Sequence, residues 1–152
     1  MNELLEIEKI KQMKGRYFRM LDTNDWDGLG TTFSDDCISS YSDGAHSYQG
    51  REAIIEFLSS SMSGDKFISM HHGHTPEITI TSETTATGIW YLQDMLVFVD
   101  SNTRLYGAGI YADEYVRVDD EWVHSKIGYK RTFECVEPLP EGHQILQNMW
   151  SR

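Results

Sequence analysis

Residues 85–118 read TATGIWYLQDMLVFVDSNTRLYGAGIYADEYVRV, and this stretch decides the fold. It is rich in β-branched and aromatic residues, and only the short polar turn at Ser101 and Asn102 interrupts it. Such a composition is typical of long strands that a tight turn joins into an antiparallel pair. We therefore predict two strands, over residues 85–100 and 104–118.

The strand pattern continues on both sides of this pair. Residues 122–134 follow an acidic turn at 119–121 and predict another strand. Upstream, residues 67–72 and 77–81 predict two parts of one strand that bends at Pro76, because proline cannot donate to the ladder. Glycines inside strands mark bends and bulges, so they predict a strongly curved sheet. Those glycines are Gly88, Gly107, Gly109 and Gly128.

The first third of the chain has the pattern of helices. Apolar residues recur at helical spacing from residue 3 to about residue 22, with Arg, Lys and Glu on the other face. Asp25 fits the N-cap of a second, short helix, and a third helix is expected after Gly50. Between these two helices, residues 37–41 predict a short strand, which a turn at 42–44 follows.

Three helices followed by a meander of long strands predict an α+β domain. We expect a cone-shaped α+β barrel, in which three N-terminal helices pack on a strongly curved antiparallel sheet. The conical cavity between them would be the usual place for a small molecule. The single domain is expected over residues 1–137, with a C-terminal tail over residues 138–152.

Composition limits the classes of partner. The chain has 152 residues, and 13 Lys and Arg against 24 Asp and Glu give a net charge of −11. This excess argues against nucleic acid and anionic membranes as partners, since both are bound through basic residues. The two cysteines, Cys37 and Cys135, fit neither a disulfide framework nor a zinc ribbon. With no signal peptide and no long apolar run, we expect a soluble cytoplasmic protein.

The most conspicuous cluster of chemical groups is His71-His72-Gly73-His74. On a regular strand His72 and His74 share one face and His71 points to the other. Three interpretations stay open: a metal chelated by two histidines, solvated histidines without a role, or a general acid/base inside the cavity. No HExxH motif, paired cysteine or third ligand at fixed spacing accompanies them, so no metal site is predicted.

Two aspartates are candidates to orient such a histidine. Asp22 lies at the end of the first helix, where it could also be an ordinary turn former. Asp94 interrupts the apolar strand and shares a face with Trp90, Leu92 and Leu96. A buried carboxylate costs several kcal/mol unless it is paired, so Asp94 is expected to line a pocket or meet a cation, unless that face is solvated.

Other polar groups pose the same question of orientation. Tyr17 lies on the core-facing stripe of the first helix, where it could pack or donate a hydrogen bond to a ligand. One of Lys130 and Arg131 must point inward. That residue could anchor an anion or a carbonyl, or it could form an ion pair with a buried acid. On the preceding strand, the same question of which residue points inward arises for Asp113, Glu114 and Tyr115.

Several motifs resemble the SnoaL-like family of the nuclear transport factor 2-like superfamily. They are Arg16-Tyr17-Phe18, Leu21-Asp22-Thr23-Asn24-Asp25-Trp26-Asp27, Phe33-Ser34-Asp35-Asp36, His71 with Thr75-Pro76-Glu77-Ile78, Ala86-Thr87-Gly88-Ile89-Trp90 and Gly128-Tyr129-Lys130-Arg131-Thr132. The resemblance covers roughly residues 5–134. It implies the cystatin-like cone of that superfamily, which hosts dehydratases, isomerases, cyclases and binding proteins alike.

Within the superfamily, two dehydratase branches imply candidate site residues. Asp22 and His71 match the Asp–His pair of fungal scytalone dehydratase, and Tyr41 matches one of its two substrate-orienting tyrosines. The other tyrosine falls on Leu21, and the second active-site histidine of that enzyme falls on Leu96.

The bile-acid 7α-dehydratase branch resembles the chain in more positions. Its catalytic Tyr, His and Asp resemble Tyr17, His71 and Asp94, its helix-end Asp resembles Asp22, and its late-strand Arg resembles Arg131. This alignment selects His71, whereas simple alternation back from Ile78 would select His72.

Together these residues predict a cofactor-independent acid/base lyase or isomerase that acts on a small hydrophobic cyclic ketone, steroid-like or polyketide-like. Tyr17, Asp22, His71 and Asp94 would be catalytic. The substrate would be bound by Tyr41, Trp90, Leu96, Tyr111 and Arg131. The alternatives are a non-catalytic small-molecule-binding or assembly module of the same fold, and the small subunit of an aromatic-ring dioxygenase.

Aromatic residues lie on both faces of the predicted strands, at Trp90 and Tyr91 and again at Tyr106 and Tyr111. A sheet with two apolar faces is expected to have one of them covered by another chain. We therefore expect a homodimer or homotrimer.

Overall fold

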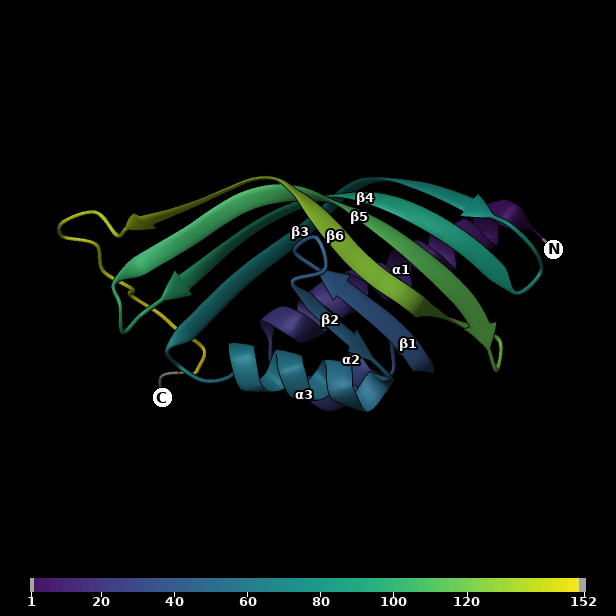
Figure 1. The fold of residues 1–152 in the computed structure, drawn as a ribbon, viewed down its shortest axis with the longest axis horizontal. Helices are drawn as coiled ribbons and strands as arrows, with labels where there is room; N and C mark the ends of the chain where they lie inside the picture. The colour runs from purple at the N-terminus through teal and green to yellow at the C-terminus, as the bar shows by residue number, and fades with distance from the viewer. Residues whose placement is uncertain (1, 151–152) are drawn as a thin grey trace.

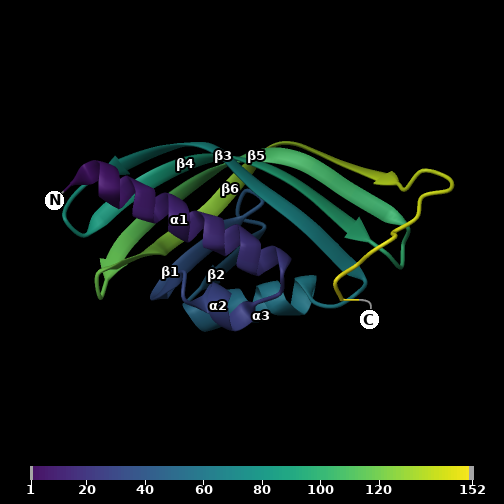
Figure 2. The same ribbon diagram turned by 180° about the vertical axis from the view of Figure 1, so that it is seen from behind.

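The computed structural model describes residues 2–150 and folds them into three helices and six strands. In chain order the elements are α1 (Glu3–Asp22), α2 (Trp26–Gly30), β1 (Phe33–Tyr41), β2 (His46–Gln49), α3 (Arg51–Met62), β3 (Phe67–Ile80), β4 (Thr85–Phe98), β5 (Thr103–Val118) and β6 (Glu121–Pro138). The long strands arch over the helices (Figure 1). Seen from behind, α1 lies across the concave face of this arch (Figure 2). The predicted α+β cone is confirmed.

The sheet has the strand order β2-β1-β6-β5-β4-β3. The three long hairpins of β3 to β6 are antiparallel, as the meander predicted. However, β1 runs parallel to β6, with Ile38 opposite Lys126, so the sheet is mixed and not wholly antiparallel. This pairing joins segments far apart in the chain, and no local sequence pattern reveals it.

Helix α1 begins and ends where the apolar stripe predicted. Ile10, Met13 and Tyr17 are almost fully buried on the side that faces the sheet. The expectation that charged residues occupy only the other face is wrong for Glu6 and Lys14, which are buried as well. After α1, the Asp25 carboxylate accepts a hydrogen bond from the backbone N–H of Gly28 at 3.0 Å, and so it caps α2 as predicted.

Strand β3 changes its facing in the middle. His71 pairs with Asp94, but the register shifts between His74 and Glu77, where Thr75 has a φ of 40°. This β-bulge adds one residue and so reverses which positions point inward. His71 therefore faces the interior before the bulge, and alternation back from Ile78 gives the wrong histidine.

A second β-bulge lies in the β5–β6 pair and contributes to the curvature of the sheet. The register shifts between Ala108 and Gly109. A Cβ built on Gly109 would lie 2.7 Å from the carbonyl oxygen of Lys130, so this close approach of two backbones requires glycine. The prediction of a curved sheet from interior glycines agrees with this geometry.

Some boundaries differ from the sequence-based prediction. β1 begins at Phe33, four residues before the predicted strand, and β2 (His46–Gln49) was not predicted. β6 runs to Pro138, and residues 139–150 then return toward the connection between α3 and β3, where the Asn148 amide donates to the carbonyl of Asp65 at 2.9 Å. Within residues 2–150, no helix combines the length and the apolar character that a membrane span needs.

Candidate active site

A cavity of about 510 Å³ lies between the concave face of the sheet and the helices. Its wall is mixed. The polar side chains at the wall include Tyr17, Tyr41, His71, Asp94, Tyr111, Tyr129, Arg131 and Glu134. The apolar ones include Phe57, Leu58, Met62, Phe67, Leu96, Phe98 and Leu105. A concave, largely apolar space with a few converging polar groups is the usual form of a small-molecule site.

His71 projects from β3 into this cavity and is held by the last residue of α1. Its Nδ1 lies 2.6 Å from Oδ1 of Asp22. The other carboxylate oxygen of Asp22 accepts the backbone N–H of His71 at 2.8 Å, and the Ser69 hydroxyl donates to Oδ1 at 2.7 Å. Three hydrogen bonds thus fix the carboxylate against β3.

This arrangement determines which nitrogen of His71 can act. An ionised carboxylate only accepts, so Nδ1 carries the proton and Nε2 keeps its lone pair. Burial alone would raise the pKa of Asp22, but its hydrogen bonds to His71 and Ser69 outweigh burial and hold the pKa below its ordinary value. Asp22 therefore stays ionised and fixes the tautomer in which Nε2 is a base.

Asp94 does not orient the histidine; it pairs with Arg131. The guanidinium donates from Nη1 and Nη2 to the two carboxylate oxygens at 2.6 and 2.7 Å. Nε of Arg131 also lies 3.0 Å from Oε2 of Glu134. Asp94 thus meets a cation and Arg131 pairs with a buried acid, which are two of the alternatives that the sequence left open.

Three tyrosines from different elements meet at the cavity wall. Tyr17, Tyr41 and Tyr111 are each at least 96% buried. Burial raises the pKa of the Tyr17 hydroxyl, and the neighbouring hydroxyls of Tyr41 and Tyr111 only partly offset this effect. Burial likewise raises the pKa values of Tyr41 and Tyr111 well above the ordinary value. All three therefore remain protonated and can donate hydrogen bonds.

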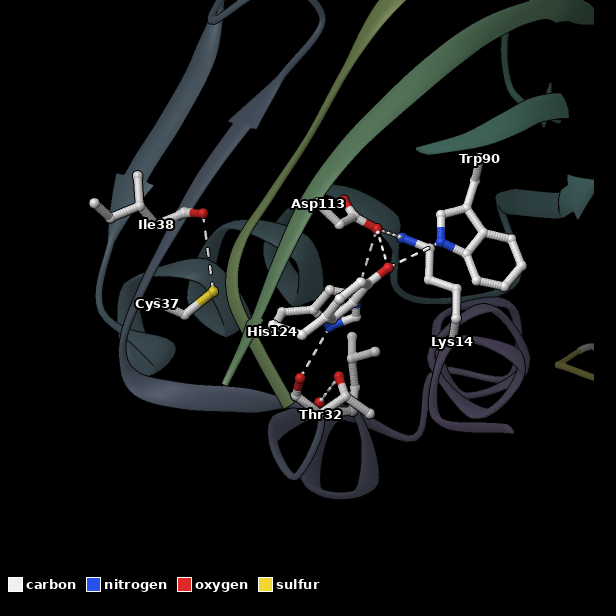
Figure 3. A network of polar contacts seen from close by, with 9 residues as sticks. Lys14, Thr32, Cys37, Ile38, Trp90, Asp113 and His124 are labelled. Carbon is white, nitrogen blue, oxygen red and sulfur yellow. Dashed lines mark hydrogen bonds and ion pairs between the residues drawn. The ribbon is translucent and has the colours of Figure 1, made fainter. Parts of the chain in front are cut away.

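A second polar network lies between α1 and the sheet (Figure 3). The ammonium of Lys14 donates to Asp113 at 2.7 Å, and neither side chain is exposed. Tyr115 donates to the same carboxylate oxygen at 3.0 Å, and Nε1 of Trp90 donates to the Tyr115 hydroxyl at 2.8 Å. The ammonium also lies 3.8 Å from the ring centroid of Tyr111, so this network supports the cavity wall from behind.

His124 closes this network on the side of β1. Its Nδ1 donates to the backbone carbonyl of Thr32 at 2.9 Å, and its Nε2 lies 3.7 Å from Asp113. Burial lowers the pKa of His124, so the imidazole is neutral. For Asp113, burial alone would raise the pKa, but the charge and the hydrogen bond of Lys14 hold it below its ordinary value.

The structure thus brings most of the predicted site residues to one cavity. Those at its wall are Tyr17, Tyr41, His71, Asp94, Leu96, Tyr111 and Arg131. Asp22 lies behind His71 as its hydrogen-bond partner. Trp90 is a correction: its ring packs below the cavity, against Gly73 and Tyr115, and does not line it.

The remaining histidines of the cluster lie elsewhere. The rings of His72 and His74 meet edge to face with their centroids 5.7 Å apart, and His74 contacts Gln93 on an exposed surface. Within the part of the chain that the structure describes, no three metal-ligating side chains come together.

The residues at or near the cavity that were not predicted from the sequence include Ser69, Tyr129 and Glu134. Ser69 shares the inward face of β3 with His71, two positions earlier, so strand alternation could have found it. Tyr129 shares a face with Arg131 in the same way. Glu134 lies beyond the bulge in the β5–β6 pair, which alternation does not register.

Comparison with solved structures finds the same fold in other proteins. Similar structures include a scytalone dehydratase-like protein from Novosphingobium aromaticivorans, which is 24% identical with a TM-score of 0.81 over 94% of this chain and 97% of that one. Hexachlorocyclohexane dehydrochlorinase LinA type 3 from Novosphingobium barchaimii is 18% identical, with a TM-score of 0.80 over 96% and 97% of the chains. ActVI-ORFA from Streptomyces coelicolor is 19% identical, with a TM-score of 0.70 over 83% and 96%.

These likenesses establish the fold. The family model of the SnoaL-like domain matches residues 2–127, which is most of the chain. The protein therefore belongs to the SnoaL-like family of the nuclear transport factor 2-like superfamily.

Proposed function

We propose that the protein is a cofactor-independent acid/base lyase or isomerase that acts on a small, hydrophobic cyclic ketone. The observation that carries the proposal is the pair of His71 and Asp22. Nδ1 is held at 2.6 Å by the carboxylate, while the ring lines an accessible cavity. A base with a fixed tautomer at the wall of an apolar cavity is the arrangement that carbon-acid chemistry needs.

In this proposal Nε2 of His71 removes the proton next to the ketone carbonyl. The electron pair of the broken C–H bond moves toward the carbonyl oxygen, and the hydroxyl of Tyr17 donates a hydrogen bond to the resulting enolate. In a lyase reaction that electron pair then forms a C=C bond as a β-hydroxyl leaves. The leaving hydroxyl takes the proton from His71, so the products are an enone and water. In an isomerase reaction His71 returns the proton to another carbon.

Asp22 stabilises the imidazolium that forms during the transfer. Two of the structural relatives are named as a dehydratase and a dehydrochlorinase; both names denote eliminations, and this supports the proposal. Apolar side chains such as Leu96 and Phe98 at the cavity wall exclude water, which strengthens each hydrogen bond there.

The first half of both reactions can be tested without knowledge of the natural substrate. 1-Tetralone, a neutral bicyclic ketone, is incubated with the protein in D₂O, and loss of its α-proton signal is followed by NMR. We expect exchange well above the buffer rate and a fall of about 10²- to 10⁴-fold in His71→Ala. His72→Ala is the matched control, because His72 is an exposed residue on the outer face of the same strand.

Two outcomes would contradict the proposal. Exchange that survives in His71→Ala would show that another group is the base. Binding of tetralone and related ketones without any exchange would instead support a non-catalytic small-molecule-binding module.

A further inference from the structure

The charged groups at the cavity wall are unevenly balanced. Arg131 is the one Lys or Arg among the described residues that line the cavity. Its Nη1 and Nη2 bind both oxygens of Asp94, and its Nε lies 3.0 Å from a carboxylate oxygen of Glu134. One positive charge therefore faces two negative charges.

The Asp94–Arg131 pair is also poorly placed to open. The side chain of Asp94 is only 2% exposed and that of Arg131 is 13% exposed. A ligand carboxylate could reach the guanidinium only by displacing Asp94, and this would leave a buried carboxylate without its partner. Glu134 and the net charge of −11 add further repulsion.

The other polar groups of the cavity suit a neutral oxygen. The Tyr41 hydroxyl is buried, and among the described residues it has no hydrogen-bond partner. Tyr17, with its raised pKa, is a donor beside it. A carbonyl or hydroxyl oxygen can accept from these groups without bringing a charge into a buried site.

We infer that Asp94 and Arg131 are specificity-determining residues, which make the cavity select neutral ring ketones and alcohols and reject carboxylates of the same size. This inference deepens the proposed function, since it takes the same cavity as the substrate site. Arg131 is neutralised by Asp94 and keeps only its outer N–H groups for a neutral acceptor. The pair therefore acts as a filter of ligand charge.

The test uses two probes of matched shape, 2-naphthol and 2-naphthoate, whose binding is followed by their fluorescence at pH 7.5. We expect the wild-type protein to bind the neutral naphthol at least about tenfold more tightly than the carboxylate. Asp94→Asn frees the guanidinium, so it should raise the affinity for naphthoate by about tenfold or more. Glu83→Gln is the control, because it removes the same charge from an exposed turn outside the cavity.

Glu134→Gln tests the same inference if the Asp94→Asn variant does not fold. Glu134 is partly exposed, so this variant should fold, and it should raise naphthoate affinity by about threefold. Equal affinity of the wild-type protein for the two probes would overturn the inference. A gain in Glu83→Gln as large as that in Asp94→Asn would also overturn it, because overall charge would then explain the selection.

The binding experiment tests the selection against carboxylates, and the exchange experiment tests the proposed function, so the two can be contradicted independently. Selective binding of naphthol with no exchange of tetralone would leave the inference standing and remove the proposed function. Exchange of tetralone together with equal binding of both probes would leave the proposed function standing and overturn the inference.

Discussion

The imidazole of His71 depends on one neighbouring carboxylate for its tautomer. In Asp22→Asn the amide can donate to Nδ1, and the proton then moves to Nε2, where the proposed base is lost. We expect the exchange of 1-tetralone to fall by about 10²- to 10⁴-fold while the fold is kept. The rate is measured by NMR in D₂O, and folding is checked by circular dichroism.

Ser69→Ala is the matched variant for this prediction. It removes one hydrogen bond to Asp22 but leaves the carboxylate and its contact with Nδ1. A loss of only a few-fold is expected, since a single hydrogen bond contributes about 0.5–1.5 kcal/mol. A rate in Asp22→Asn as high as that in Ser69→Ala would show that the carboxylate does not fix the tautomer.

Single residues also show how far the sequence predicts the site. Resemblance to the family selected His71 and Asp22, and the structure places them in contact. Strand alternation alone selected His72, because a one-residue bulge cannot be recognised from a pattern of period two. The pairing of Lys14 with Asp113 was missed, since these residues lie 99 positions apart and each resembles a surface charge on its own element.

At the scale of elements, α1 and β3 approach each other closely at Gly73. A Cβ there would lie 2.4 Å from Cε2 of Phe18, and the Phe18 ring is itself buried. Gly73→Ala should therefore push α1 away from the sheet and lower the free energy of unfolding by about 1–3 kcal/mol. Chemical denaturation with urea measures this change.

Gly15→Ala, a glycine-to-alanine change within α1 itself, is expected to stabilise the protein. Gly15 is exposed in the interior of α1, and among residues 2–150 a Cβ there would meet no neighbouring atom within 4 Å. Alanine should raise the free energy of unfolding by about 0.5–1 kcal/mol, because glycine costs helix stability. Destabilisation by both variants would indicate that the helix, and not its contact with β3, is the sensitive feature.

Elements with strong local patterns were predicted well. Helix α1 was predicted from its continuous apolar stripe. Helix α2 was predicted from its acidic N-cap residue, Asp25. Strand β2 was missed because His46–Gln49 is short and polar, and only its pairing with β1 makes it a strand. The parallel contact of β1 with β6 depends on the folded chain as a whole.

At the scale of the whole molecule, the stability should depend on pH through His124. The unfolded chain binds a proton at His124 below about pH 6.5, but burial lowers the pKa in the folded state. Stability is therefore full above pH 6.5 and falls as the pH decreases, by at most about 1.4 kcal/mol per pH unit from this group. Asp22 and Asp113, whose pKa values are lowered, add to the loss only below about pH 4.

Urea denaturation at pH values from 7.5 to 5 tests this dependence. His124→Gln should flatten the slope between pH 6.5 and 5, whereas His72→Gln, an exposed residue, should leave it unchanged. An identical slope in wild type and His124→Gln would contradict the assignment.

The outer face of the sheet carries an unusual number of exposed apolar side chains. They are Ile38, Ile89, Tyr91, Tyr106 and Phe133, each between 36% and 49% exposed. We predict that this face is covered in a homodimer or homotrimer, as a large exposed apolar patch suggests.

Size-exclusion chromatography with light scattering should give a dimer or trimer for the wild-type protein, and Tyr91→Lys should shift the protein to the monomer. Leu4→Lys is the control, because it changes an exposed apolar residue on α1 and should leave the oligomer unchanged. A monomeric wild-type protein would contradict the prediction.

The buried contacts of α1 have a consequence for how the chain is made. Lys14 finds its counterion 99 residues later in the sequence, and Glu6 accepts from Trp122, which is 116 residues later. At ordinary rates of translation, roughly 5–20 s pass before the ribosome delivers Asp113. During that delay β3, against which α1 packs, is already made, but the ammonium of Lys14 has no carboxylate partner. The buried charges of the helix that is synthesised before every strand are therefore paired only near the end of synthesis, and nascent chains stalled before β5 should be the ones that chaperones retain.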